Sequence, residues 1–414
     1  NNPSSGVFAY EGNPNLSFAL PQSNVILDPS SLRVCGRIRY STPVPVNPEN
    51  ITYDSKIGLV NSCWENISIS SLGTRNVIER INQYNRLCQS IVPTLNGADG
   101  YLGNLCEQSL GADSYTYQNA EFDAALTNGD GADFACPLLM GLTLTGSKLP
   151  LHPLQGLIIN LELASNEAVF CVSGVERPKY ELYDLSLTGE YLIPTPEQRE
   201  ALMSEKGGVI QCNTFTQLFS ILQSTQHSYQ ANLGMSELIS MIFSFAPASS
   251  INNYAANQFQ ALRVVDQNGA TQQATKMQFL KNGVATPYTY DLNVLLNSSE
   301  AQLQQSFLQS LRKLNDLTKI TLNQNNNDPR YNIGCPGYLV NTANQQNPVN
   351  KLCVSYGIPY DFLGEGRSGA NFKNQPVTIN VTTSLTDSNP NACWLFALAK
   401  TIIEYDANGI RVIS

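Results

Sequence analysis

The stretch LIINLEL at residues 157–163 places an apolar side chain at every second position. This alternation is typical of a β-strand that buries one face of a sheet and leaves the other face more polar. The stretches YDLSLT at 183–188 and VTINVT at 377–382 alternate in the same way. These patterns predict a mainly β protein.

Tight turns separate the predicted strands. Asn-Gly pairs, which suit the type I′ turn of a β-hairpin, occur at 268–269, 282–283 and 408–409. The last pair lies between two apolar-rich arms, so residues 401–413 read as a terminal hairpin. Many short strands joined by such turns favour sandwiches or barrels.

Three segments carry helical patterns instead. Over 74–91, apolar residues recur at alternating steps of four and three, a stripe that would pack on its own sandwich or form a seam between copies. A second helix is predicted over 299–317, opened by the capping box Ser-Glu-Ala-Gln. The third is capped by Thr195, has Pro196 at its first position and ends at Gly207.

The length of 414 residues fits two large domains, at about 150 residues or more for each. Pro178 breaks the strand before it, which predicts a first domain over 1–176 and a second over 177–414. Each half then holds enough strands for one large β-sandwich. Two polar stretches, 323–328 and 341–350, read as long exposed loops.

Composition limits the function classes. Charged residues make up 14% of the chain, against about 25% in ordinary soluble domains, so the polar surface is mostly neutral. That surface suits packing against identical copies, and it also suits a secreted adhesin or lectin. With 24 Lys and Arg against 33 Asp and Glu and no basic cluster, we expect no direct nucleic-acid contact. No apolar run reaches about 18 residues, so we expect no membrane span.

The ten cysteines have irregular spacing and form no Cys-x-x-Cys pair. A zinc or redox site built on paired cysteines is therefore not expected. Several of them lie within apolar runs, where a free cysteine behaves as a small buried hydrophobe. The sequence predicts reduced thiols.

Catalytic motifs are weak. His152 and His227 are the only histidines, and neither stands beside a nucleophile motif. The Gly-x-Gly-x-x-Gly match at 364–369 leads into a polar segment and a strand, whereas a dinucleotide site needs a helix there. The glycine-rich segment 128–133 lacks the acid spacing of a calcium loop, so it reads as a turn.

Paired carboxylates suggest a β-sandwich glycosidase as an alternative. Glu-x-Asp occurs at 121–123 and 404–406, but the second acid expected three residues further on is replaced by Leu126 and Gly409. We therefore predict a non-enzyme with no catalytic, cofactor-binding or metal-binding residues.

Short stretches spread over most of the chain share features with one protein family: SNVILDPSSL at 23–32, ENISI at 65–69 with VIERINQY at 77–84, LPL at 149–151 with GLII at 156–159, and the segments 234–247 and 394–413. Together they resemble the double jelly-roll major capsid proteins of polinton-like viruses, adintoviruses and virophages.

This resemblance implies a fold and a function. The fold would be two side-by-side eight-stranded jelly rolls with a few short helices. Three copies would form a pseudo-hexagonal capsomer of an icosahedral dsDNA virus shell. Penton and minor capsid proteins, a protease and a packaging ATPase would be its companions. The chain would reside in the virion after assembly inside the host cell, with no cofactor and no active site.

Three other classes remain as alternatives. A carbohydrate-binding or adhesin β-sandwich would present aromatic residues around a cleft, whereas the 19 tyrosines are scattered along the chain. A β-sandwich hydrolase lacks its full set of acids. A penton or minor capsid protein would need only one jelly roll, and this chain is long enough for two.

Overall fold

A computed structural model gives the fold of the chain. The structure describes residues 6–41, 43–47, 51–53, 59–88, 126, 128–129, 131–144, 148–172, 174–204, 207–222, 226–248, 251–255, 275–285, 292–294, 337–339, 351–353, 355–359, 370–373, 376–383, 391–406 and 409–413.

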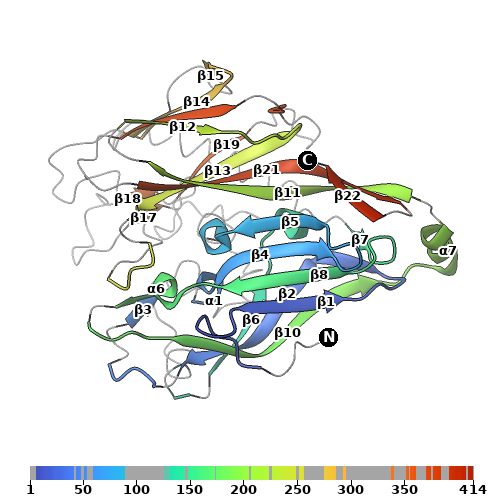
Figure 1. The fold of residues 1–414 in the computed structure, drawn as a ribbon, viewed down its shortest axis with the longest axis horizontal. Helices are drawn as coiled ribbons and strands as arrows, with labels where there is room; N and C mark the ends of the chain where they lie inside the picture. Colours follow the sequence, from blue (N-terminus) through green and yellow to red (C-terminus); the bar gives the residue numbers. More distant parts are fainter. Residues whose placement is uncertain are drawn as a thin grey trace.

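The first half is a pair of antiparallel sheets (Figure 1). One sheet has the order β1 (Asn15–Leu20), β8 (Leu157–Leu163), β4 (Trp64–Ser71) and β5 (Val77–Asn82). The other has β10 (Tyr180–Leu192), β2 (Ile26–Tyr40) and β6 (Ala132–Pro137), and β7 (Leu149–Pro150) also pairs with β2. The short strands β3 (Ile51–Tyr53) and β9 (Phe170–Val172) form a separate pair.

The second half repeats this plan. One sheet has the order β11 (Gly207–Leu222), β21 (Asn391–Asp406), β13 (Leu238–Pro247) and β19 (Ser355–Pro359), and β22 (Gly409–Ile413) also pairs with β21. The other has β12 (Gln226–Ala231), β20 (Val377–Thr383), β14 (Thr275–Lys281) and β15 (Val284–Ala285), and β16 (Leu292–Val294) also pairs with β14. β17 (Gly337–Leu339) and β18 (Lys351–Cys353) form a separate pair. The predicted fold class, mainly β in two wrapped antiparallel units, is confirmed.

Side-chain alternation explains where the strands form. All four odd-numbered side chains of β8 are buried and the even-numbered ones between them are half-exposed, as its sequence predicts. The β14–β15 turn places Asn282 and Gly283 at φ values of 49° and 78°, as a type I′ turn requires. The terminal hairpin also forms, with Asp406 and Gly409 as its last register pair.

The described helices are short: α1 (Leu59–Ser62), a turn over 84–88, α5 (Gly141–Leu144), α6 (Asn166–Val169) and α7 (Pro196–Ser204). The predicted cap of α7 is confirmed. The Thr195 hydroxyl oxygen accepts the Gln198 N–H at 3.4 Å, and the Gln198 side-chain oxygen accepts the Thr195 N–H at 3.1 Å. This reciprocal pair is a capping box.

The helix predicted over 74–91 is wrong for most of its described length. Residues 77–82 form β5, which pairs with β4, and only 84–88 are helical. The β-branched residues Val77, Ile78 and Ile81 suit a strand, and pairing with β4 decides the conformation. Gln83, at φ 50°, separates the strand from the helical turn.

Several other predicted features lie outside the described residues: the helix over 299–317, the turn at 268–269, the loops at 323–328 and 341–350, and the glycine-rich segment 364–369.

The domain boundary at 176/177 stays a prediction. β10 begins three residues later and pairs with β2 along most of its length. Strand pairing thus groups β10 with the first half, and α7 follows it at one end of the molecule (Figure 1). We propose that the halves divide in the α7 connection, after Leu192.

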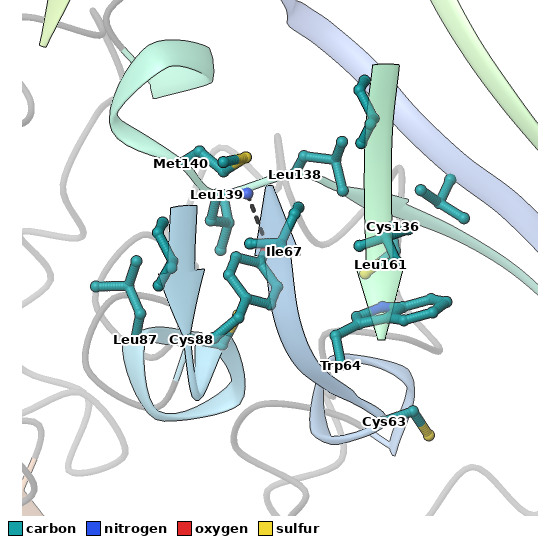
Figure 2. Packing of buried hydrophobic residues seen from close by; sticks show 14 of the residues in the cluster. Cys63, Trp64, Ile67, Leu87, Cys88, Cys136, Leu138, Leu139, Met140 and Leu161 are labelled. Carbon is teal, nitrogen blue, oxygen red and sulfur yellow. Dashed lines mark hydrogen bonds between the residues drawn. The ribbon is translucent and has the colours of Figure 1, made fainter. Parts of the chain in front are cut away.

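One buried apolar cluster extends through both halves. In its first-half part, Trp64, Ile67 and Leu161 lie close to Cys136 and Leu138 (Figure 2). The Tyr84 hydroxyl accepts the Leu139 N–H at 2.7 Å, the bond that is dashed in Figure 2. Among the helices that the structure describes, none combines the length and the hydropathy that a bilayer crossing needs.

Candidate functional site at the junction of the two halves

The two histidines lie in different halves. His152 follows β7 in the first half, and its backbone oxygen accepts hydrogen bonds from Gln22 and Gln155. His227 lies in β12 of the second half. Within the described part of the chain, no three His, Cys, Asp or Glu side chains gather as a metal site would require.

The acidic and glycine-rich candidates have structural roles where they are described. Asp406 accepts the Gly409 N–H at 3.1 Å and so closes the terminal hairpin. Leu126 is buried in the core, and the pair at 121–123 lies outside the described residues. In the glycine-rich segment 128–133, Asp133 is the second residue of β6 and forms an ion pair with Arg37 at 2.9 Å.

A polar site lies where the two halves meet. β5, at the edge of a first-half sheet, lies beside β11, at the edge of a second-half sheet (Figure 1). α5 also packs against β11. The junction is therefore made by two sheet edges and a helical turn.

Glu79 is the centre of this junction. Its side chain extends from β5 and the residue is only 2% exposed. One carboxylate oxygen accepts the Gly141 N–H at 2.9 Å and the Phe215 N–H at 2.6 Å, and the other accepts the Leu142 N–H at 2.9 Å. A single first-half carboxylate thus satisfies backbone donors of α5 and of the second-half strand β11.

Close backbone approach requires glycine at position 141. A Cβ atom there would lie 2.7 Å from the Thr214 Cα and 2.8 Å from the Asn213 backbone oxygen. Those distances are shorter than any real Cβ contact, so a larger residue would push α5 away from β11. Gly141 therefore sets the spacing that lets Glu79 reach both elements.

Burial and hydrogen bonding act on Glu79 in opposite directions. Loss of water disfavours the charged carboxylate and raises its pKa, whereas the three N–H donors favour the charge and lower the pKa. Burial is the larger effect, and it raises the pKa of Glu79 from 4.5 to about 7. The charge of the junction therefore changes near neutral pH.

A second anchor is formed around Trp394 of β21. Its indole N–H donates to the side-chain oxygen of Gln83, and the Arg86 guanidinium lies 4.0 Å from its ring centroid. On the second-half side, the Phe219 ring centroid is 5.5 Å from that of Trp394. Trp394 and Arg86 are each 1% exposed, so this cation–π contact is desolvated, where such contacts are strongest.

A third contact joins the terminal hairpin to the β4–β5 turn. The Asn76 amide donates to the Ile410 backbone oxygen. Gly409 lies close to Thr74, because a Cβ atom at Gly409 would be 3.0 Å from the Thr74 methyl carbon. The chain terminus is thereby fixed to the first half.

β21 supplies most of the apolar contact. Every residue from 392 to 399 is buried, although alternate residues of a strand point to opposite faces of the sheet. Trp394, Phe396 and Leu398 belong to the cluster that includes the first-half core, whereas Cys393 and Leu395 do not. One face of β21 thus packs on the first half and the other on the interior of the second half.

The cysteines whose side chains the structure describes are all free thiols, as predicted: Cys35, Cys63, Cys88, Cys136, Cys171, Cys212 and Cys393. Burial raises the pKa of Cys88 and of Cys212 to about 12. These thiols stay protonated at neutral pH and are poor nucleophiles.

Several solved structures of capsid proteins share this two-sandwich arrangement. The PBCV-1 virus capsid protein matches with a TM-score of 0.56 and 12% identity, over 99% of this chain and 94% of that one. The Faustovirus major capsid protein matches with a TM-score of 0.52 and 9% identity, over 98% and 91% of the two chains. The Sputnik virophage structure matches with a TM-score of 0.51 and 10% identity, over 99% and 88%.

The chain has the double jelly-roll fold of viral major capsid proteins. The match extends over nearly the whole chain, so both halves and their order along the chain are shared. The sequence itself matches no protein-family model and no curated protein.

The sequence interpretation missed the junction between the two jelly rolls. Glu79 was assigned to an amphipathic helix, where a charged residue would face solvent. Two signals were available: the β-branched run around Glu79, and the unbroken apolar stretch ACWLFALA at 392–399. A continuous apolar strand indicates burial on both faces, and hence a second layer.

Proposed function

We propose that this chain is a major capsid protein that forms homotrimeric, pseudo-hexagonal capsomers of an icosahedral dsDNA virus shell. The observation that carries the proposal is the pair of jelly rolls, joined by a buried junction, along the whole chain. PBCV-1 and Faustovirus capsid proteins share this arrangement over about nine-tenths or more of their own length. At 9–12% identity the likeness establishes the fold, and the role in a shell is the proposal.

Composition supports a structural role. The surface carries few charges, and desolvating neutral polar groups in an interface costs less than desolvating ions. The net charge of −9 argues against direct contact with a genome, because phosphate neutralisation needs clustered Lys and Arg. We therefore propose a virion component without enzymatic activity, whose partners are its own copies and the penton and minor capsid proteins.

Size-exclusion chromatography with light scattering tests this function. A trimer should have three times the 45.3 kDa mass of one chain and should persist at micromolar concentration. Negative-stain images of the same sample should show pseudo-hexagonal particles. A monomer at all concentrations that is stabilised by glycans would instead favour the carbohydrate-binding or adhesin function.

A further inference from the structure

The contact between β5 and β11 is made by side chains and not by a strand ladder. β5 pairs with β4, β11 pairs with β21, and no register joins β5 to β11 among the described strands (Figure 1). The hydrogen bond that links the two strands runs from the Phe215 N–H to the Glu79 carboxylate, at 2.6 Å. The two sheets can therefore separate here without breaking the ladder of either one.

The elements that cover Glu79 bring no charge to it. α5 has the sequence GLTL and contains no ionisable side chain. The only ionisable side chain of β11 is Cys212, which is buried close enough for the Glu79 charge to act on its thiol. Burial raises the pKa of Cys212 to about 12, so this thiol is neutral near pH 7. The second jelly roll thus offers Glu79 no counter-ion in the described part of the chain.

The first jelly roll does not compensate the charge either. Arg80 follows Glu79 in β5, but its side chain belongs to an exposed residue. β4 carries Glu65, whose charged neighbours are Arg86 and Glu162. The only groups that favour the ionised form of Glu79 are the three backbone N–H donors of α5 and β11.

Opening of the contact would return the Glu79 carboxylate to water. In the closed junction, loss of hydration disfavours the charge more than the three donors favour it, and the pKa is about 7. In an open junction the hydrated carboxyl would return to its ordinary pKa of 4.5. Each proton that leaves Glu79 therefore shifts the balance toward the open junction.

Other contacts would keep the jelly rolls together during such an opening. The Trp394 indole N–H donates to Gln83, and the Asn76 amide donates to the Ile410 backbone oxygen. Both are hydrogen bonds between neutral groups, so they do not weaken when an acid ionises. The separation would stay local to β5, α5 and β11.

We propose that Glu79 is a proton-controlled latch between the two jelly rolls. The protonated side chain holds β11 against β5 and α5, and the ionised side chain draws in water and parts them while each sandwich stays folded. The latch lies within one chain, so this inference goes beyond the proposed capsid function and does not depend on it.

Alkylation of Cys212 in the full chain tests the latch. Cys212 is 4% exposed, so iodoacetamide should reach it only when the junction opens. Cys88, in the core of the first jelly roll, is the internal reference, because burial raises its pKa to about 12 as well. Since pH changes the ionisation of both thiols alike, the ratio of their rates, measured by mass spectrometry, reports the opening.

The wild-type ratio of the Cys212 rate to the Cys88 rate should rise about tenfold from pH 6 to pH 8. This factor follows from a carboxyl whose pKa is about 7 when the junction is closed and 4.5 when it is open. In Glu79→Gln the ratio should stay constant, because glutamine has no proton to lose. A constant ratio in the wild type, or an equal rise in the variant, overturns the latch.

Hydrogen exchange decides if the variant does not fold. In the wild type, the protection of the Leu142 and Phe215 amides, corrected for the intrinsic effect of pH, should fall about tenfold from pH 6 to pH 8. The amide of Leu161, in the core of the first jelly roll, should keep its protection. Unchanged protection of Leu142 and Phe215, or an equal loss at Leu161, overturns the latch. None of these results bears on the capsid proposal, which the mass of the oligomer tests separately.

Discussion

Replacement of Glu79 by glutamine should change how the stability of the protein depends on pH. The folded protein binds the Glu79 proton more tightly than the unfolded chain, because burial raises the pKa from 4.5 to about 7. The free energy of unfolding should therefore contain a contribution that is complete below pH 4.5 and is lost as the pH rises through 7. Glutamine has no proton to lose, so the variant should lack this contribution.

The size of the effect follows from the pKa. A difference of about 2.5 pKa units corresponds to about 3 kcal/mol. Glutamine also places an amide donor against one of the three backbone donors, which should cost about 1–3 kcal/mol at every pH. The free energy of unfolding of the wild type should thus exceed that of the variant most at pH 4.5. At pH 8 this difference should be smaller by about 3 kcal/mol.

Thermal melts from pH 4.5 to pH 8 would measure this. The difference in melting temperature between wild type and variant should shrink by roughly 6–12 °C over that range, at about 2–4 °C per kcal/mol for a jelly roll of about 200 residues. Glu190→Gln, at an exposed glutamate of β10, serves as the control for loss of one surface carboxylate. A difference that stays constant from pH 4.5 to pH 8 would refute the reasoning, since Glu79 would then not titrate in that window.

Four further predictions concern packing, close backbone approach, capping and thiols. Trp394→Ala should lower the free energy of unfolding by about 3–5 kcal/mol in urea titrations, because a fully buried indole is removed from the junction. Gly141→Ala should cost about 1–3 kcal/mol by forcing α5 away from β11, whereas Gly174→Ala, which meets no atom within 4 Å, should be close to neutral. Thr195→Ala should cost about 1 kcal/mol by removing the cap of α7, and a variant as stable as the wild type would show that the cap contributes nothing. Cys393 should react with a thiol reagent only after unfolding, because it is 2% exposed and burial raises its pKa; rapid reaction in the native protein would contradict this.

Local sequence determined those elements that depend on patterns or hydrogen bonds among residues close together in the chain. The alternation of β8, the capping box of α7 and the turn between β14 and β15 all depend on neighbours within a few residues, and the structure has all three. Enough such elements lay along the chain to indicate a mainly β protein.

The segment over 74–91 shows the limit of local patterns. The same spacing of apolar residues fits one face of a helix, and the propensity difference between the two conformations is small. Pairing of β5 with β4, a strand that starts 13 residues earlier, selects the extended form. The conformation of residues 77–82 therefore depends on β4, which lies outside the segment.

The sequence by itself determined the class of structure and the low charge of its surface, because both depend on composition and on contacts between near neighbours. The tertiary structure alone decided that Glu79 is a buried carboxylate and that the layer over one face of β21 is the first jelly roll. Glu79 bonds to residues 62, 63 and 136 positions away, and only the meeting of the two jelly rolls brings those donors within 3 Å. The physical reason is that such long-range contacts depend on how complete sheets pack, which no short stretch of sequence encodes.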